Sequence, residues 1–368
     1  MKKFISIRIP KIAIFLFIFS CLSVNAQLDL PRASQKAKVE QTVGITDITV
    51  SYSRPYVKGR EVWGKLVPYG MNNLGFGTAK ESPWRAGADE NTTIEFTDDV
   101  TIEGKPLKAG KYGLFMVIHE DNTADIIFSD NNTAWGSFFY NPDEDALRIT
   151  VKTGEIPFKE LLTYEFIDVQ ANSTTLALQW EKKQIPFKID VDVSDIVLTN
   201  IRKELQGQNG FTRTNWEQAA RYAMNNGDPD EALQWIDAAI AGQFFSEKTV
   251  ANQFLKSQIL ANQGKTGESL ALLEQLIDAA NVNQLNAIGY QFLMNGKVDK
   301  AIEIFKLNVK KNPSNANVYD SLGEGYKTKG DKKNAIKNYK KALSLNPVPA
   351  LKANSIAKLK ELGVDYSD

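Results

Sequence analysis

A repeat with a period of 34 residues near the C-terminus limits what this chain can fold into. Seven positions recur in chemical type at that spacing: Leu285, Ile288, Gly289, Phe292, Ala301, Phe305 and Pro313 return as Tyr319, Leu322, Gly323, Tyr326, Ala335, Tyr339 and Pro347. Small residues let the two helices of a hairpin approach, aromatic side chains fill the groove between them, and proline ends the second helix. Each copy therefore predicts a helical hairpin that buries its apolar face by stacking on its neighbours.

Two weaker copies come earlier, with turns at Asn226-Gly227-Asp228 and Gln263-Gly264-Lys265, and residues 351–362 suit a capping helix. The spacing and the residue types resemble the tetratricopeptide repeat. This resemblance implies a right-handed α-helical solenoid over residues 201–368 that docks a protein partner. The copies exceed the minimum of about three that such a solenoid needs to bury a continuous core.

The first half of the chain has the period of β-strands instead. Ile48, Val50 and Tyr52 alternate with polar neighbours, and Pro55 ends that run. Further strands are expected at 92–96, 100–102, 112–119, 124–128, 147–151, 162–169, 174–180 and 185–193. Short strands separated by frequent turns are typical of antiparallel sandwiches and barrels. We therefore predict an antiparallel β-sandwich or barrel over residues 27–200, followed by the solenoid.

Six ordered motifs mark this half of the chain. They are Tyr52-Ser53-Arg54-Pro55, Lys58-Gly59-Arg60, Leu66-Val67-Pro68-Tyr69-Gly70, Trp84-Arg85-Ala86-Gly87-Ala88, Leu107-Lys108-Ala109-Gly110-Lys111-Tyr112 and Trp135-Gly136. Together they resemble the domain of unknown function family 2911 over roughly residues 31–190. The resemblance implies an exported bacterial β-domain without an assigned activity. The sequence departs from it at Asp89, where the family more often has Asn, and at residues 72–82, which look like an insertion.

The N-terminus has the composition of a secretory signal. Four basic residues precede an apolar run at 12–22, and Val24-Asn25-Ala26 supplies a small residue for cleavage. A membrane-spanning helix needs about 20 apolar residues, so the run indicates a cleaved signal peptide at 1–26 and no transmembrane segment. Phe19 disfavours a lipoprotein cleavage site before Cys21. We expect an exported protein, periplasmic or secreted.

The residue inventory excludes several kinds of active site. Cys21 is the single cysteine and His119 the single histidine. Cleavage after Ala26 would leave no cysteine, which excludes disulfides, thiol nucleophiles and Cys-His dyads, and a single histidine excludes histidine zinc clusters. The acidic segment at 141–145 lacks the glycine and the final glutamate of a calcium loop. We expect no metal and no cofactor, and interpret His119 as a partly exposed residue at a strand end.

Arginine and aromatic side chains gather in two segments that flank a glycine-rich loop at 63–83. The candidate ligand-binding residues are Arg54, Tyr56, Arg60, Trp84, Arg85, Asp89 and Glu90. Guanidinium groups beside aromatic rings suit a carboxylate, a phosphate or a sugar. The same residues suit an ion-pair network, such as Arg85 with Asp89, and the many glycines favour this fastening role. Asp89 and Glu90 are disfavoured as an acid/base pair because adjacent strand residues point to opposite faces.

The inner helices of the solenoid hold the candidate partner-binding residues, which are Asn286, Tyr290, Asp320 and Glu324. Residues 297–360 carry 15 lysines and five acidic residues. This charge suits a solvated surface or an acidic partner. Nucleic acid is disfavoured because arginine and aromatic residues are not interleaved with the lysines.

These patterns predict an exported binding or scaffolding protein whose solenoid docks a protein partner. The alternative is a small-molecule module, anion- or sugar-binding or hydrolytic, that uses the arginine and tryptophan surface of the β-domain. Convergence of Arg54, Arg60 and Arg85 on an open pocket would favour this alternative. Burial of each arginine against a carboxylate would favour the structural role. The residue inventory favours binding over catalysis.

Overall fold

A computed structural model describes residues 30–242 and 244–366 of the chain. The signal peptide expected at 1–26 lies outside this part. The chain divides after Val191 into two compact units, which we call the β unit and the helical unit. The boundary expected between residues 200 and 201 would fall inside the first helix of the second unit, which Asp192 caps by accepting a hydrogen bond from the Asp195 amide at 3.1 Å.

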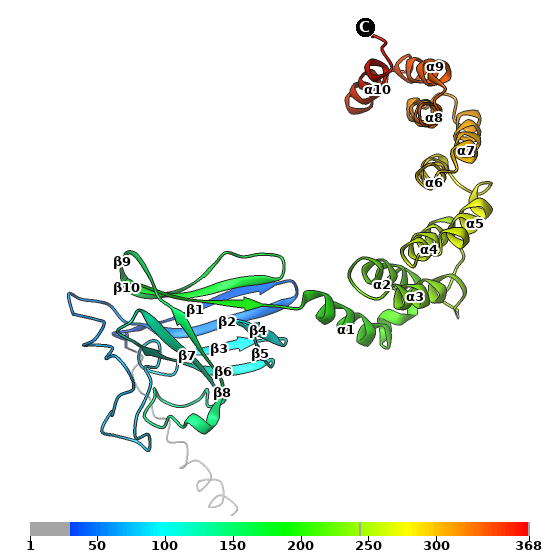
Figure 1. The fold of residues 1–368 in the computed structure, drawn as a ribbon. Helices are drawn as coiled ribbons and strands as arrows, with labels where there is room; N and C mark the ends of the chain where they lie inside the picture. Colours follow the sequence, from blue (N-terminus) through cyan, green and yellow to red (C-terminus); the bar gives the residue numbers. More distant parts are fainter. Residues whose placement is uncertain (1–29, 243, 367–368) are drawn as a thin grey trace, which may run out of the picture. The chain divides into compact units, whose positions relative to one another are not determined.

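The β unit is a sandwich of two antiparallel sheets (Figure 1). Six strands follow the order β1-β2-β3-β6-β7-β8 and four follow the order β5-β4-β10-β9, and neither sheet closes into a barrel. The strands are β1 (Gln35–Val43), β2 (Thr46–Arg54), β3 (Thr93–Phe96), β4 (Val100–Ile102), β5 (Lys105–Leu107), β6 (Gly110–Ile118), β7 (Thr123–Ser129), β8 (Asp145–Lys152), β9 (Gly154–Ile167) and β10 (Ser173–Asp190).

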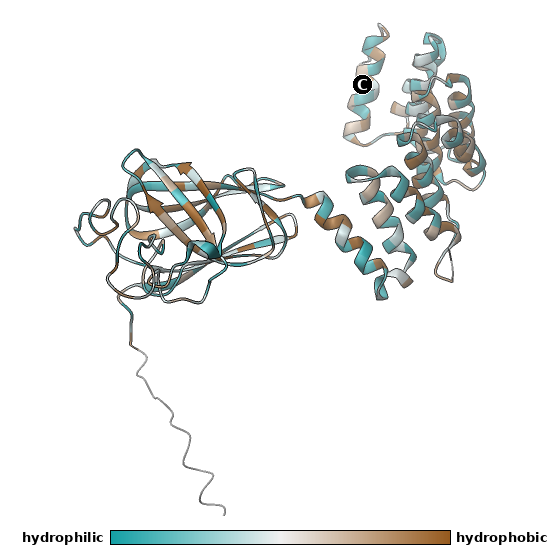
Figure 2. Ribbon diagram, turned by 60° about the horizontal axis from the view of Figure 1, so that its bottom comes forward, coloured by the Kyte–Doolittle hydropathy of each residue, from teal (hydrophilic) through white to brown (hydrophobic). Residues whose placement is uncertain are grey.

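The core lies between the two sheets. Hydrophobic and hydrophilic residues alternate along the strands, as the colours of Figure 2 show, so each sheet turns one apolar face inward. Rings from opposite sheets touch there: Tyr52 meets Tyr164 edge-on at 4.8 Å, and Phe128 meets Phe187 at 5.8 Å. The predicted sandwich is confirmed, and the barrel alternative is not.

Three strands differ from the sequence prediction. The short strand β5 (Lys105–Leu107) was not predicted, because Gly104 and Pro106 are typical of a turn. β1 was not predicted because its alternate residues are charged and only Val43 is buried, as suits an edge strand. The predicted strands at 174–180 and 185–193 form the single strand β10, which continues through the expected break with register shifts around Glu181. Glu181 has a positive φ of 55°, the local kink that a bulge introduces.

The helical unit holds ten α-helices among its described residues. They are α1 (Val193–Leu205), α2 (Arg213–Asn226), α3 (Pro229–Ala241), α4 (Val250–Asn262), α5 (Thr266–Leu276), α6 (Val282–Met294), α7 (Val298–Lys311), α8 (Ala316–Lys329), α9 (Lys332–Leu343) and α10 (Pro349–Glu361). The helices α2 to α9 form four hairpins and α10 caps the last one (Figure 1). No helix in the described ranges is both long and apolar enough to cross a membrane.

The close approach inside each hairpin explains the repeated glycines. A Cβ on Gly289 would lie 2.4 Å from the ring of Phe305, and one on Gly323 would lie 2.9 Å from the ring of Tyr339. Only glycine lets these aromatic rings reach the facing helix. The helical solenoid is confirmed. The distances also agree with the expectation that small residues let the two helices of each hairpin approach.

Candidate ligand-binding site

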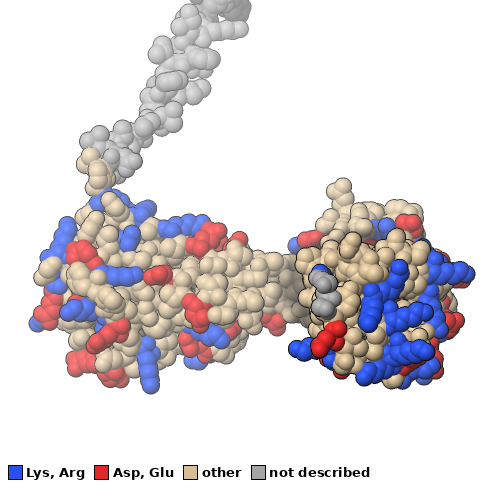
Figure 3. All heavy atoms as spheres, turned by 90° about the horizontal axis from the view of Figure 1, so that it is seen from above, with Lys and Arg blue, Asp and Glu red and all other residues tan. Residues whose placement is uncertain are grey.

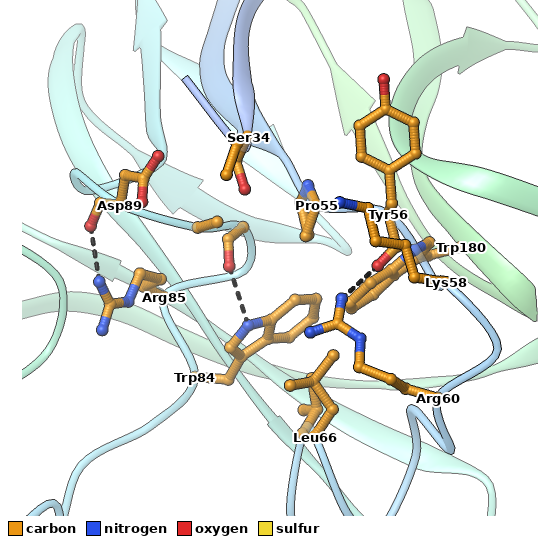
Figure 4. A pocket seen from close by; sticks show the side chains of 14 residues that line it. Ser34, Pro55, Tyr56, Lys58, Arg60, Leu66, Trp84, Arg85, Asp89 and Trp180 are labelled. Carbon is orange, nitrogen blue, oxygen red and sulfur yellow. Dashed lines mark hydrogen bonds between the residues drawn. The ribbon is translucent and has the colours of Figure 1, made fainter. Parts of the chain in front are cut away.

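A cleft of about 480 Å³ opens on the β unit beside the long connection between β2 and β3 (Figure 4). Its lining comes from the segment before β1, from both ends of this connection and from β10. The lining residues are Ala33, Ser34, Pro55, Tyr56, Lys58, Arg60, Leu66, Val67, Trp84, Arg85, Gly87, Ala88, Asp89 and Trp180. The volume is that of a site for a small organic molecule.

Short β-bridges fasten the connection to the sandwich. Gly70 donates to the Ile118 carbonyl at 2.8 Å, and Trp84 exchanges two backbone hydrogen bonds of 2.8 Å with Met116. At the far end, the buried hydroxyl of Tyr164 donates to the Ala86 carbonyl at 2.9 Å. The loop that carries Trp84 and Arg85 is therefore fixed by the backbone and by Tyr164, without an ion pair from Arg85.

A tight turn presents the first two cations. Lys58 and Gly59 have positive φ angles of 47° and 66°, and the Arg60 amide closes the turn onto the Val57 carbonyl at 3.1 Å. The pattern matches a type I′ turn, in which glycine suits the second position. Arg60 folds back and donates from Nε to the Val57 carbonyl at 3.0 Å and from Nη2 to the Tyr56 carbonyl. The exposed Lys58 holds its Nζ 5.4 Å from the Tyr56 ring centre.

Arg85 supplies the third cation and is half-buried. Its Nη1 donates to the backbone carbonyl of Asp89 at 2.6 Å, and its Cζ lies 5.4 Å from the Phe138 ring centre. Gly136 leaves the space for this guanidinium, because a Cβ there would lie 2.5 Å from Cζ. Burial lowers the pKa of Arg85, against an opposing effect of the Asp89 charge. Among the described residues no carboxylate lies within 4.0 Å of it.

Stacked indoles form the apolar wall of the cleft. Trp84 stacks on Trp180 at 6.1 Å with 18° between the ring planes, and Trp63 meets both rings edge-on at 5.9 Å. Trp84 donates from Nε1 to the Gly87 carbonyl at 3.1 Å. The Nε1 atoms of Trp63 and Trp180 are buried and find no acceptor within 30–242 and 244–366. Buried donors are normally paired, so these two unpaired indole nitrogens are exceptions inside the tryptophan cluster.

Arg54 and Glu90 belong to other parts of the β unit. Arg54 donates to the Leu162 carbonyl at 2.9 Å and to Thr163 Oγ1 at 2.7 Å, so it braces β9. Arg32 holds Glu90 through two hydrogen bonds of 2.7 and 2.8 Å, and the Lys36 ammonium lies 3.1 Å away. The Arg32 guanidinium is the main cause that lowers the pKa of Glu90 to about 2.

Of the seven candidates, five line the cleft: Tyr56, Arg60, Trp84, Arg85 and Asp89. Arg60 and Arg85 both line the cleft, whereas Arg54 does not. None of these three arginines forms an ion pair in the described structure. The expected Arg85–Asp89 ion pair is replaced by a hydrogen bond to the Asp89 backbone. Sequence reasoning did not select Lys58, although it stands between two chosen residues. Trp180 gave no signal, because it is brought in by β10 from far along the chain.

The four helical candidates are engaged to different degrees. Asp320 is buried and accepts hydrogen bonds from Ser355 and, at 3.2 Å, from Asn354 of α10. Burial raises the pKa of Asp320. Glu324 accepts from the Tyr339 hydroxyl at 2.8 Å. The capping helix therefore covers Asp320, which corrects its expected exposure to a partner.

Asn286 and Tyr290 remain on the inner helix α6. Tyr290 is half-buried and packs edge-on against Phe305 at 5.2 Å. The Oδ1 atom of Asn286 is buried and has no donor among the residues that the structure describes. Of the four candidates, these two lie away from the capping helix.

His119 and the acidic turns lie outside the cleft. The Nε2 atom of His119 is 3.5 Å from the Asp125 carboxylate, in a network that includes Arg148. Within the described ranges no group of three or more His, Cys, Asp or Glu side chains could hold a metal ion.

Comparison with family models divides the chain in the same way as its fold. Residues 34–189 match the model of a protein family of unknown function, DUF2911. The β unit carries the DUF2911 match. Residues 316–349, which span α8 and α9, match the tetratricopeptide repeat model. Five of the six sequence motifs of the DUF2911 unit place a residue in the cleft or, as Gly136 does, against Arg85.

The helical unit also has likenesses among solved structures. MamA 41-end from Desulfovibrio magneticus RS-1 is 16% identical, over 43% of this chain and 96% of that chain, with a TM-score of 0.31. Another MamA crystal structure is 19% identical, over 44% of this chain and 92% of that chain, with a TM-score of 0.35. YrrB, described as a TPR protein with an unusual peptide-binding site, is 16% identical over 44% and 82%, with a TM-score of 0.34. A search of curated proteins finds no match.

Proposed function

We propose that this is an exported binding protein whose DUF2911 unit holds a small anionic ligand in the cleft and whose helical unit docks a protein partner. The observation that carries the ligand site is the half-buried Arg85, which has no carboxylate partner in the described structure. Burial of a charge is costly, the Asp89 carboxylate offsets this cost only from beyond 4.0 Å, and an anion bound in the cleft would reduce it further.

The chemistry of the lining defines the ligand class. Lys58, Arg60 and Arg85 are cationic donors, and Asp89 is the only carboxylate among the described lining residues. An anion whose oxygens accept hydrogen bonds, such as a phosphate or a carboxylate, complements this set. The indole wall adds space for a flat apolar group next to the anion.

Binding is favoured over hydrolysis by the same lining. Glu90 faces a different groove and is held by Arg32, so Asp89 has no second carboxylate with which to share acid/base work. His119 is not part of the lining. A general acid/base pair needs two groups of suitable pKa within reach of one substrate.

Tryptophan fluorescence tests the ligand site directly, because Trp84 and Trp180 form its wall. Phenyl phosphate is the probe, with inorganic phosphate and phenol as partial probes that carry only one of its two groups. We expect saturable quenching by phenyl phosphate, weaker binding of phosphate, and none of phenol. Equal responses to phenol and phenyl phosphate would contradict an anion site.

The helical unit supports a protein-interaction role through its tetratricopeptide hairpins. Capture from an envelope extract, with the full chain and with a chain that ends at Val191, tests the docking role. The shorter chain keeps every strand, and the Val191 amide closes the fold on the Asn172 carbonyl at 2.9 Å. Partners should be lost with the helical unit; their retention by the β unit alone would contradict docking by the repeats.

Export is proposed from the residue pattern at 1–26. Sequencing of the N-terminus of the protein purified from its native source tests it. Gln27 should be the first residue, and an intact Met1 would contradict cleavage.

A further inference from the structure

The outer helices of the helical unit change charge from one hairpin to the next. α3 carries three carboxylates and α5 two, and neither has a basic residue. α7 carries four lysines against two carboxylates, and α9 carries five lysines and no carboxylate. Blue side chains gather on one face of the helical unit in Figure 3.

The outer helices before α9 pair many of their charges within the unit. Glu231 of α3 binds Arg202 at 2.7 Å, Asp237 of α3 binds Lys256 at 2.6 Å, and Glu274 of α5 binds Lys300 of α7 at 2.7 Å. None of the α9 lysines takes part in an ion pair with another described residue. Most carboxylates of α3 and α5 are thus already paired within the unit. This pairing argues against a dimer in which α9 of one copy binds α3 and α5 of another.

The five lysines are the only exposed residues of α9: Lys332, Lys333, Lys337, Lys340 and Lys341. Its remaining residues, such as Ala335 and Tyr339, are buried or half-buried. Lys337 is three or four residues from Lys333, Lys340 and Lys341, spacings at which like charges destabilise a helix. Lys332 and Lys333 also stand at the N-terminus, where the helix dipole disfavours cations. The N-cap Asp331 offsets part of this charge beside Lys333, and Lys341 holds its Nζ 5.9 Å from the Tyr319 ring centre. No carboxylate of the described unit lies within 4.0 Å of any of the five ammonium groups, so most of the repulsion remains.

From this charge pattern we infer that α9 adsorbs to the surface of a membrane rich in anionic phospholipid. Protein interfaces concentrate aromatic residues and arginine and are depleted in lysine, and nucleic-acid sites interleave arginine and aromatics. The exposed face of α9 has no arginine and no aromatic residue. A row of hydrated ammonium groups without an apolar side chain instead suits a layer of phosphate headgroups, to which each lysine near the surface adds attraction.

Co-sedimentation with vesicles tests this inference, using the expected mature chain from Gln27. The vesicles contain phosphatidylcholine alone or phosphatidylcholine mixed with phosphatidylglycerol. Binding should require phosphatidylglycerol and should disappear in about 1 M salt, where the Debye length is about 3 Å. K337Q/K340Q/K341Q should weaken the partition coefficient by roughly 100-fold, whereas K337R/K340R/K341R should retain binding.

A matched triple variant in the β unit, K80Q/K152Q/K182Q, separates the α9 surface from net charge. These three lysines are exposed and form no ion pair in the described structure. The variant should bind vesicles as the wild type does, and circular dichroism should show that every variant is folded. An equal loss in both glutamine variants would overturn the inference. So would α9-dependent binding to polyglutamate without binding to vesicles, which would make the partner an acidic protein.

Discussion

Arg85 donates a hydrogen bond of 2.6 Å to the backbone carbonyl of Asp89 and leaves the Asp89 carboxylate without a cation within 4.0 Å among the described residues. The carbonyl orients the guanidinium without neutralising it. Arg85 therefore does not fasten the loop through an ion pair. Its half-buried guanidinium is held by one hydrogen bond and keeps further N–H donors unused. This relationship is the reason for placing an anion in the cleft.

Replacement of Arg54 should affect stability and leave the cleft intact. R54A removes the two hydrogen bonds to β9 and should lower the free energy of unfolding by about 2 kcal/mol, since hydrogen bonds to charged groups contribute about 1.5–3 kcal/mol. Denaturant unfolding measures the loss, and titration with phenyl phosphate should give the wild-type affinity. A large loss of affinity without a loss of stability would mean that Arg54 contacts the ligand.

The space at Gly136 should matter for binding beyond its backbone angle. G136A places a methyl group 2.5 Å from the present position of Arg85 Cζ and should displace the guanidinium. We expect the affinity for phenyl phosphate to fall about tenfold, comparable to the loss of one charged hydrogen bond. Gly104 is the control: its φ of 79° is as positive as the 67° of Gly136, but a Cβ there meets no atom within 4 Å. G104A should lose stability through strain alone. Equal effects of the two variants on affinity would contradict the steric account.

Acid should remove the contribution of Glu90 to stability. Its pKa is about 2 in the folded chain, chiefly because of Arg32, against about 4.3 for a free glutamate. A depressed folded pKa stabilises the fold above the unfolded pKa, and this stabilisation is lost as the pH falls from about 4 to about 2. E90Q should therefore be less stable than the wild type at pH 7 and should approach it near pH 2. A difference that does not change with pH would exclude the ion pair as its cause.

Asp320 should show the opposite sign. Burial raises its folded pKa above the unfolded value, so the ionised carboxylate costs stability once the pH exceeds the unfolded pKa of about 3.9. D320N can still accept the Ser355 hydrogen bond and should raise the melting temperature at pH 7. The gain should vanish below about pH 4, where the wild type is protonated in both states. A lower melting temperature at pH 7 would show that Ser355 and Asn354 stabilise the charged form sufficiently.

The sequence was most informative where structure depends on neighbours in the chain. The contacts of Gly289 with Phe305 and of Gly323 with Tyr339 follow from a repeat whose partners are about 16 residues apart, within one hairpin. The two flanks of the cleft, Tyr56 to Arg60 and Trp84 to Asp89, were also found from local composition. Whether these residues pair with carboxylates or leave donors open toward the cleft could be seen only from distances.

Features that depend on distant pairing could not be predicted. Trp180 lies on the long strand β10, which continues past residue 181, where the sequence prediction ended one strand. Arg54 turns to β9, more than 100 residues away, so its proximity to Arg60 in sequence was misleading. Asp320 is covered by α10, which occupies the place of the first helix of a further, incomplete repeat. Asn354, 34 residues after Asp320, lies at the same repeat position and donates a hydrogen bond to it.

The affinity of phenyl phosphate for the wild type and for R85Q, measured by calorimetry on the full mature chain, tests the ligand site most directly. R202Q serves as the control, since Arg202 lies in the helical unit and is paired with Glu231. Loss of hydrogen bonds to a charged group predicts that R85Q weakens binding roughly 10- to 100-fold while R202Q leaves it unchanged. Equal affinities of R85Q and the wild type would contradict an anion site built on Arg85.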